Sequence, residues 1–154
     1  LYYAGFAHDC YLVGSGDGTG GVIRTIMETY LHGYIPHLFD NSTIATAIEN
    51  TMGWFVSIQF PDGNMPTYPA GSTACAEHFG NDSNARVQWC HGGPGFIDTF
   101  TKAAIVFDKL NMTTQADQYF NSGLKAYNST WNRGLIIKGL MQCHGIGGNI
   151  YTVL

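Results

Sequence analysis

The chain is poor in charged side chains, which make up 12% of its 154 residues, about half the share of an average soluble domain. It has only 7 basic residues and a net charge of −4, so it has no basic surface for nucleic acid or anionic lipid. No apolar run reaches the roughly 18 residues of a membrane-spanning helix. What remains is a globular chain long enough for one domain with a hydrophobic core.

Cysteine is scarce, and an even number of cysteines could mean two disulfides in a secreted domain. The four are Cys10, Cys75, Cys90 and Cys143. Four N-x-S/T sequons have the same implication, and they begin at Asn41, Asn81, Asn111 and Asn128. However, so short a motif arises by chance in an asparagine-rich chain, and the cysteine spacings are not those of a dense disulfide scaffold. We therefore expect a cytoplasmic protein without disulfides. Cys10 and Cys75 fall in loop-like segments, with no partner at the spacing of metal ligands.

Glycine, in contrast, is abundant, with 20 residues, and six of them lie in two near-copies of one motif. The copies occupy residues 90–97 and 143–150, and both read C-H-G-x-x-G-x-I. Thiolate and imidazole groups are the usual zinc ligands in proteins. The repeat therefore predicts one metal ion held between two units of a single architecture.

A third, degraded copy of the motif lies near the start of the chain. Residues 21–25 match its later part, and the histidine expected in the earlier part is present as His8. The glycine-rich stretch of residues 10–18 separates the two parts. We therefore interpret this stretch as an insertion.

Between the motifs, apolar residues recur every three or four positions, as buried helix faces require. These stripes lie within residues 23–31, 44–58, 97–107 and 116–124, whereas residues 61–82 carry three prolines and predict a loop. Helix pairs of this kind must stack on neighbours to bury their apolar faces. We expect an all-α array with its glycine-rich turns at one end. A closed ring would bring the two Cys-His pairs together, and a linear solenoid would keep them in adjacent units.

The motifs resemble those of the lanthionine synthetase C-like family. The match is with residues 86–92, 138–145 and 148–149, while residues 60–66 resemble a loop of the eukaryotic branch. Residues 3–8 resemble a third family motif, G-x-A-H-G, except that aspartate follows the histidine. The resemblance implies an α/α toroid of helical hairpins with zinc at one end. Residues 1–154 would form one part of that domain, with N-terminal and C-terminal hairpins missing.

The resemblance further implies that Cys90, Cys143 and His144 bind Zn²⁺. Three protein ligands leave one tetrahedral position open, as a catalytic zinc requires. His91 has two interpretations. The symmetry of the repeat would make it a fourth ligand of a closed structural site, whereas the resemblance gives it a catalytic or substrate-facing role outside the ligand set.

The resemblance assigns roles to three more residues, each of which has a simpler alternative. His8 would handle the proton that an enolate takes up after thiol addition, or it is an exposed loop histidine. Arg86 would stabilise the enolate oxygen or hold a carboxylate. Lys138 would contact glutathione. Arg86 and Lys138 could instead be solvated surface charges.

The function that the resemblance implies is zinc-dependent addition of a thiol to a dehydroamino acid in a peptide or protein. Glutathione or a peptide cysteine would supply the thiol. The alternative is a non-catalytic helical scaffold that binds zinc and glutathione without turnover.

Overall fold

The structure is a computed structural model that describes residues 10–154, so His8 lies outside the described residues. The described part contains helices and no β-strand, which confirms the all-α prediction. In chain order the elements are α1 (Thr19–Leu31), the 3₁₀ helix η1 (Leu38–Asp40), α2 (Ser42–Ile58), α3 (Thr73–Phe79), α4 (Gly93–Lys109), α5 (Thr113–Arg133) and α6 (Ile146–Val153). Among these residues, none of the helices has the length and apolarity needed to cross a bilayer.

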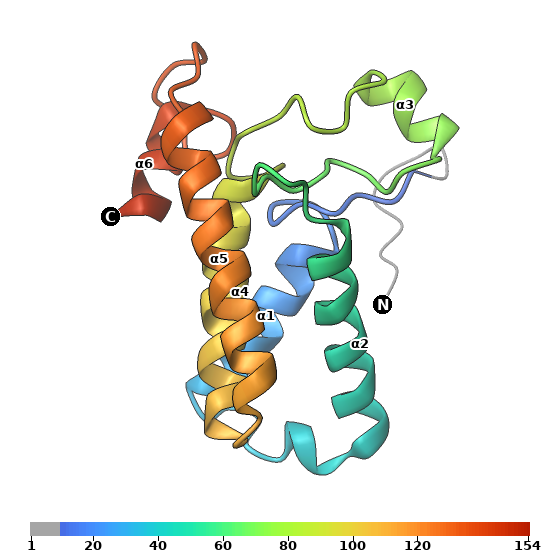
Figure 1. Cartoon of the computed structure of the whole chain (residues 1–154), viewed down its shortest axis with the longest axis vertical. Helices are drawn as coiled ribbons and strands as arrows, with labels where there is room; N and C mark the ends of the chain where they lie inside the picture. Colours follow the sequence, from blue (N-terminus) through green and yellow to red (C-terminus); the bar gives the residue numbers. More distant parts are fainter. Residues whose placement is uncertain (1–9) are drawn as a thin grey trace.

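The helices form hairpins whose closing turns lie at the lower end of Figure 1, whereas the glycine-rich turns that lead into the hairpins lie toward the opposite end. The first hairpin joins α1 to α2 through η1, and the second joins α4 to α5. Helix α4 packs against α5, against α1 and against α6. Each of α1, α4 and α6 starts from a glycine-rich turn, and all three turns lie at the upper end of the view. This arrangement is that of part of an α/α toroid.

The core between the hairpins is built largely from aromatic rings. Phe55 of α2 meets Phe96 of α4 edge to face, with ring centroids 4.9 Å apart. Further along α4, Phe107 meets Tyr119 of α5 in the same way at 5.0 Å. All four side chains are at most 1% exposed. Burial of each ring contributes about 1.5 to 3 kcal/mol, so these contacts fix α4 as the central helix.

Helix α3 corrects the prediction that residues 61–82 form a loop. The Ser72 hydroxyl accepts a hydrogen bond from the Cys75 amide and caps the start of the helix. Gly80 ends it with φ at +85°, a conformation that favours glycine. The helix has only seven residues, too few for the apolar stripe on which the sequence assignment of the other helices depended.

A disulfide between Cys10 and Cys75 corrects a second expectation, that the protein has no disulfides. It fastens the segment before α1 to the first turn of α3. Both cysteines are buried and cluster with Leu12 and Tyr68. The two positions are 65 residues apart in the chain, and no sequence spacing signals a pairing over that distance.

Burial of Tyr119 makes a prediction about alkaline stability. Burial, with a smaller effect of the Glu49 charge, raises the pKa of this phenol to about 12, above the value near 10 of an exposed tyrosine. The stability that the neutral phenol contributes is complete below pH 10 and is lost as pH rises toward 12. In urea unfolding, we expect the midpoint to fall less between about pH 8 and about pH 11 in Tyr119→Phe than in the unsubstituted protein. An equal fall in both would contradict this assignment.

Candidate metal centre

Three turns of the same design open α1, α4 and α6. The residue that caps the start of each helix is a glycine: Gly18, Gly92 or Gly145. The residues immediately before these glycines are therefore equivalent, and they are Asp17, His91 and His144. In the first turn the position that holds histidine in the other two is thus occupied by Asp17.

This equivalence corrects the interpretation of residues 10–18 as an insertion that displaces His8. The segment belongs to the turn itself and is tied into the fold by backbone hydrogen bonds. The Val13 amide donates to the Thr67 carbonyl at 3.1 Å, and the Gly16 amide donates to the Cys90 carbonyl at 3.3 Å. Val13 is fully buried in the main core. The sequence interpretation matched the first turn to the other two by its histidine, His8, whereas the equivalent positions are set by the glycine that caps the helix.

The second and third turns bring Cys90, Cys143 and His144 together. Their candidate ligand atoms all lie within 4.8 Å of one another, and no other group of this kind occurs in the described part of the chain. The Cys90 amide donates a hydrogen bond to the Cys143 carbonyl at 3.1 Å, so the two turns are paired through their backbones. Cys90 is buried, whereas Cys143 and His144 are exposed. The cluster therefore has one side closed by protein and one side open to solvent.

Two glycines permit close backbone contacts around the cluster, one between the first and second turns and one within the third. A Cβ atom at Gly14 would lie 1.9 Å from the Cys90 carbonyl oxygen. A Cβ atom at Gly148 would lie 1.8 Å from the Gln142 carbonyl oxygen, just before Cys143. Contacts that short cannot be relieved by a side-chain movement, because each partner is backbone.

Polar side chains reach the buried thiol from outside the motif. The Gln88 amide donates to Cys90 Sγ at 3.4 Å, and Lys138 Nζ donates to Gln88 Oε1 at 3.0 Å. Burial first, and then the hydrogen bond and charge of Cys143 and the charge of Asp17, raise the pKa of Cys90 to about 12. Without a cation, this thiol is therefore neutral at physiological pH. The Gln88 hydrogen bond acts in the opposite direction.

His91 lies outside the three-residue cluster, although it follows Cys90 directly. Its Nε2 atom is 3.3 Å from an Asp17 carboxylate oxygen, and its buried Nδ1 atom has no hydrogen-bond partner within the described residues. Burial lowers the pKa of the ring, and Asp17 partly offsets this effect. This arrangement does not favour the closed four-ligand site that the symmetry of the repeat suggested.

Of the other predicted site residues, Lys138 reaches the cluster through Gln88, whereas Arg86 lies near His91. Arg86 donates from Nη1 to the Phe79 carbonyl at 2.9 Å, and its guanidinium lies 5.2 Å from the centroid of the Phe79 ring. Its charge and that of Lys138 both lower the pKa of His91, so both cations lie near that ring. Arg86 also fastens α3 to the turn, a role that the sequence did not predict.

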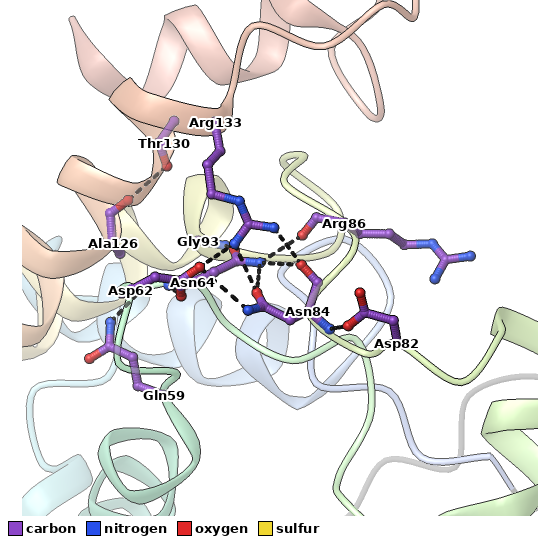
Figure 2. Close-up of polar contacts among 11 residues, drawn as sticks. Gln59, Asp62, Asn64, Asp82, Asn84, Arg86, Gly93, Ala126, Thr130 and Arg133 are labelled. Carbon is purple, nitrogen blue, oxygen red and sulfur yellow. Dashed lines mark hydrogen bonds and ion pairs between the residues drawn. The ribbon is translucent and has the colours of Figure 1, made fainter.

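A buried asparagine outside the motifs, Asn64, binds residues on both sides of Cys90 in the sequence (Figure 2). The Asn64 side chain donates to the Asn84 carbonyl, to Asn84 Oδ1 and to the Arg86 carbonyl, and it accepts from the Gly93 amide at 2.6 Å. Arg133 of α5 reaches the same cluster and binds Asn84 and Asp62. The only sequence signal for Asn64 was its place in the segment 60–66.

We expect Asn64→Ala to lower the free energy of unfolding by roughly 2 to 4 kcal/mol, because it leaves a buried amide and several carbonyls unpaired. Urea unfolding measures this loss. Asn50→Ala, an exposed position on α2, is the matched control and should cost no more than about 0.5 kcal/mol. A loss at Asn64 no larger than the control would refute its central role.

Comparison with known proteins shows which family the chain belongs to. Residues 4–154 match the family model for lanthionine synthetase C-like proteins. The chain belongs to this family. It is similar to glutathione S-transferase LANCL1 of Danio rerio, with 28% identity over 142 residues that cover 92% of this chain and 29% of that protein. It is also similar to LanC-like protein GCL1 of Arabidopsis thaliana, with 32% identity over 108 residues, or 70% of this chain and 21% of that protein. This lanthionine synthetase C-like chain thus spans less than a third of the length of either relative.

Proposed function

We propose that the protein binds one zinc ion through Cys90, Cys143 and His144 and adds a thiol, glutathione in particular, to dehydroamino acids in peptides or proteins. The observation that carries the proposal is the convergence of these three side chains within 4.8 Å. The two cysteines are 53 positions apart in the sequence. Nothing in an ordinary core requires two thiols and an imidazole to meet at the open end of a helical array.

The donor set fits zinc. Two thiols and one imidazole match the ligand preference of this borderline-soft ion, and three protein ligands leave a fourth position for a substrate. A bound cation would also place a positive charge next to the buried Cys90 thiol, so that both thiols can ionise. When bound, the ion would keep an added thiol ionised and nucleophilic at neutral pH.

The residues around the cluster have distinct tasks in this proposal. Gln88 orients the Cys90 sulfur through its hydrogen bond. Asp17 lies 3.3 Å from Nε2 of His91 and fixes the orientation of the ring. In the reaction a bond forms between the thiol sulfur and the β-carbon, and the α-carbon takes up a proton. We propose that His91 and Arg86 act on that part of the substrate, Arg86 by stabilising the enolate oxygen.

Three observations support glutathione and a peptide as the substrates. A relative bears the name glutathione S-transferase, and the exposed Lys138 offers a cation beside the cluster for a glutathione carboxylate. A surface hollow of about 570 Å³ borders the Cys90 turn and is lined by Ser15, Asp17, Arg24 and Trp89, among others. Its size suits several residues of a peptide.

The second candidate function is a scaffold that binds zinc and glutathione without turnover. The observation that favours it is Asp17, which stands where the other two turns have histidine. An imidazole is the side chain best suited to proton transfer near neutral pH, and the first turn lacks it at this position. His8 keeps its predicted role as a hypothesis.

The chain would act as one part of a longer helical ring. Its α5 helix and C-terminal segment expose large apolar side chains, among them Phe120, Trp131, Leu135 and Ile137. Exposed apolar surface of this extent is characteristic of a face that other parts of a protein cover. We therefore assign the activity to the intact protein, in which further hairpins would cover this face.

Metal analysis of the intact protein tests the ligand set. We expect about one zinc ion per chain from the three-ligand site, with near-complete loss of zinc in Cys90→Ala, Cys143→Ala and His144→Ala. His91→Ala is the matched control, because it removes the imidazole next to Cys90 and should retain the metal. Zinc lost on His91→Ala to the same extent would indicate a closed site and argue against catalysis.

Turnover is tested separately by mixing the intact protein with glutathione and a dehydroalanine peptide. Mass spectrometry should detect the thioether adduct, at a rate that Cys143→Ala reduces to the uncatalysed rate. Glutathione binding without an adduct would instead establish the scaffold function.

A further inference from the structure

The structure contains a covalent link that a reducing compartment does not maintain. Cys10 and Cys75 form a disulfide in a buried cluster, with a Cα–Cα distance of 4.8 Å that lies within the usual range. Disulfides of this structural kind persist in the secretory pathway and outside the cell, and they are rare in the cytosol. The bond therefore counts against the cytoplasmic location expected from the sequence, which no other observation tests.

The N-glycosylation sequons are an observation that is independent of the disulfide. The chain has ten asparagines, and four of them begin a sequon. Serine and threonine make up about one residue in seven, so chance alone would supply one or two sequons. All four sequon asparagines, Asn41, Asn81, Asn111 and Asn128, are exposed.

The buried asparagines behave differently. Asn64 and Asn149 are at most 2% exposed, and neither is followed two positions later by serine or threonine. Sequons thus occur only where the asparagine side chain reaches solvent, which is the condition for modification by an external enzyme.

The four sites lie on different elements, and Asn111 lies far from the metal centre. Asn41 precedes α2, Asn81 follows α3, and Asn128 lies on α5. Asn111 lies in the turn after α4, whereas Cys90 precedes the start of that helix. A helix of 17 residues places these two ends about 25 Å apart, at a rise of about 1.5 Å per residue. A glycan at Asn111 would therefore not obstruct the cluster.

We propose that this chain matures in an oxidising secretory compartment, where the Cys10–Cys75 disulfide forms and Asn41, Asn81, Asn111 and Asn128 receive N-linked glycans. In the glycosylation, the asparagine Nδ2 atom loses a proton and bonds to the first sugar of a lipid-linked diphosphate oligosaccharide, and the lipid diphosphate leaves. In the disulfide step, two thiols transfer two electrons and two protons to a disulfide oxidant of that compartment. The inference is independent of the proposed thiol chemistry.

The test uses the intact protein purified from the cells that produce it. Free thiols are alkylated without reduction, and the protein is then treated with peptide-N-glycosidase in ¹⁸O-labelled water and analysed by peptide mass spectrometry. We expect ¹⁸O-labelled aspartate at all four sites and a linked pair of peptides that contain Cys10 and Cys75. Asn121 is the matched control, because it is exposed on the same helix as Asn128 but lacks a sequon, and it should stay unlabelled.

Unlabelled asparagine at all four sites would overturn the proposal, and so would alkylated Cys10 and Cys75. Variants provide a second readout by gel mobility. Thr43→Ala, Ser83→Ala and Thr113→Ala each remove a sequon but keep its asparagine, and each should remove one glycan. Asn128→Gln serves at the fourth site, because the hydroxyl of Thr130 is buried and bonded to the Ala126 carbonyl. Zinc content, measured on the same sample, distinguishes failure of this proposal from failure of the metal site.

Discussion

The hydrogen bond from the Cys90 amide to the Cys143 carbonyl is the contact on which the candidate site depends. It pairs the two glycine-rich turns that precede α4 and α6. Glycines keep the surrounding backbone close, because a Cβ atom at Gly14 of the first turn would strike the Cys90 carbonyl and one at Gly148 would strike the Gln142 carbonyl. Because the turns are held at the level of the backbone, the thiols of Cys90 and Cys143 and the imidazole of His144 meet without long, flexible side chains. The position of the site is therefore a property of the turns, and the helices behind them serve to hold the turns in place.

That support links the site to the stability of the whole domain. Helix α4 begins at the Cys90 turn and continues into the aromatic core, where Phe96 and Phe107 pack against α2 and α5. Asn64 accepts a hydrogen bond from the Gly93 amide at the start of α4. Asn149 donates hydrogen bonds to the Val87 and Gly134 carbonyls. Loosening any of these contacts would separate the ligands, so metal affinity and folding stability should change together.

The sequence predicted the features that repeat or that follow helical periodicity. The paired C-H-G motifs predicted the meeting of Cys90 and Cys143, and the apolar stripes predicted the four longest helices. The sequence failed where the controlling interaction is long-range or has no periodicity. The Cys10–Cys75 disulfide joins residues 65 positions apart, and Asn64 binds partners that lie 20 to 29 positions later in the chain. The equivalence of Asp17 and His91 was missed because it depends on where a helix begins and not on residue type.

The central claim is that two sulfurs and one nitrogen of this chain surround a single zinc ion and leave room for a substrate sulfur. X-ray absorption spectroscopy at the zinc edge of the intact protein tests it most directly. The account predicts two sulfur neighbours at about 2.3 Å and one imidazole nitrogen at about 2.0 to 2.1 Å, with a third sulfur when glutathione is added. A first shell with fewer than two sulfurs, or one in which glutathione adds none, would contradict it.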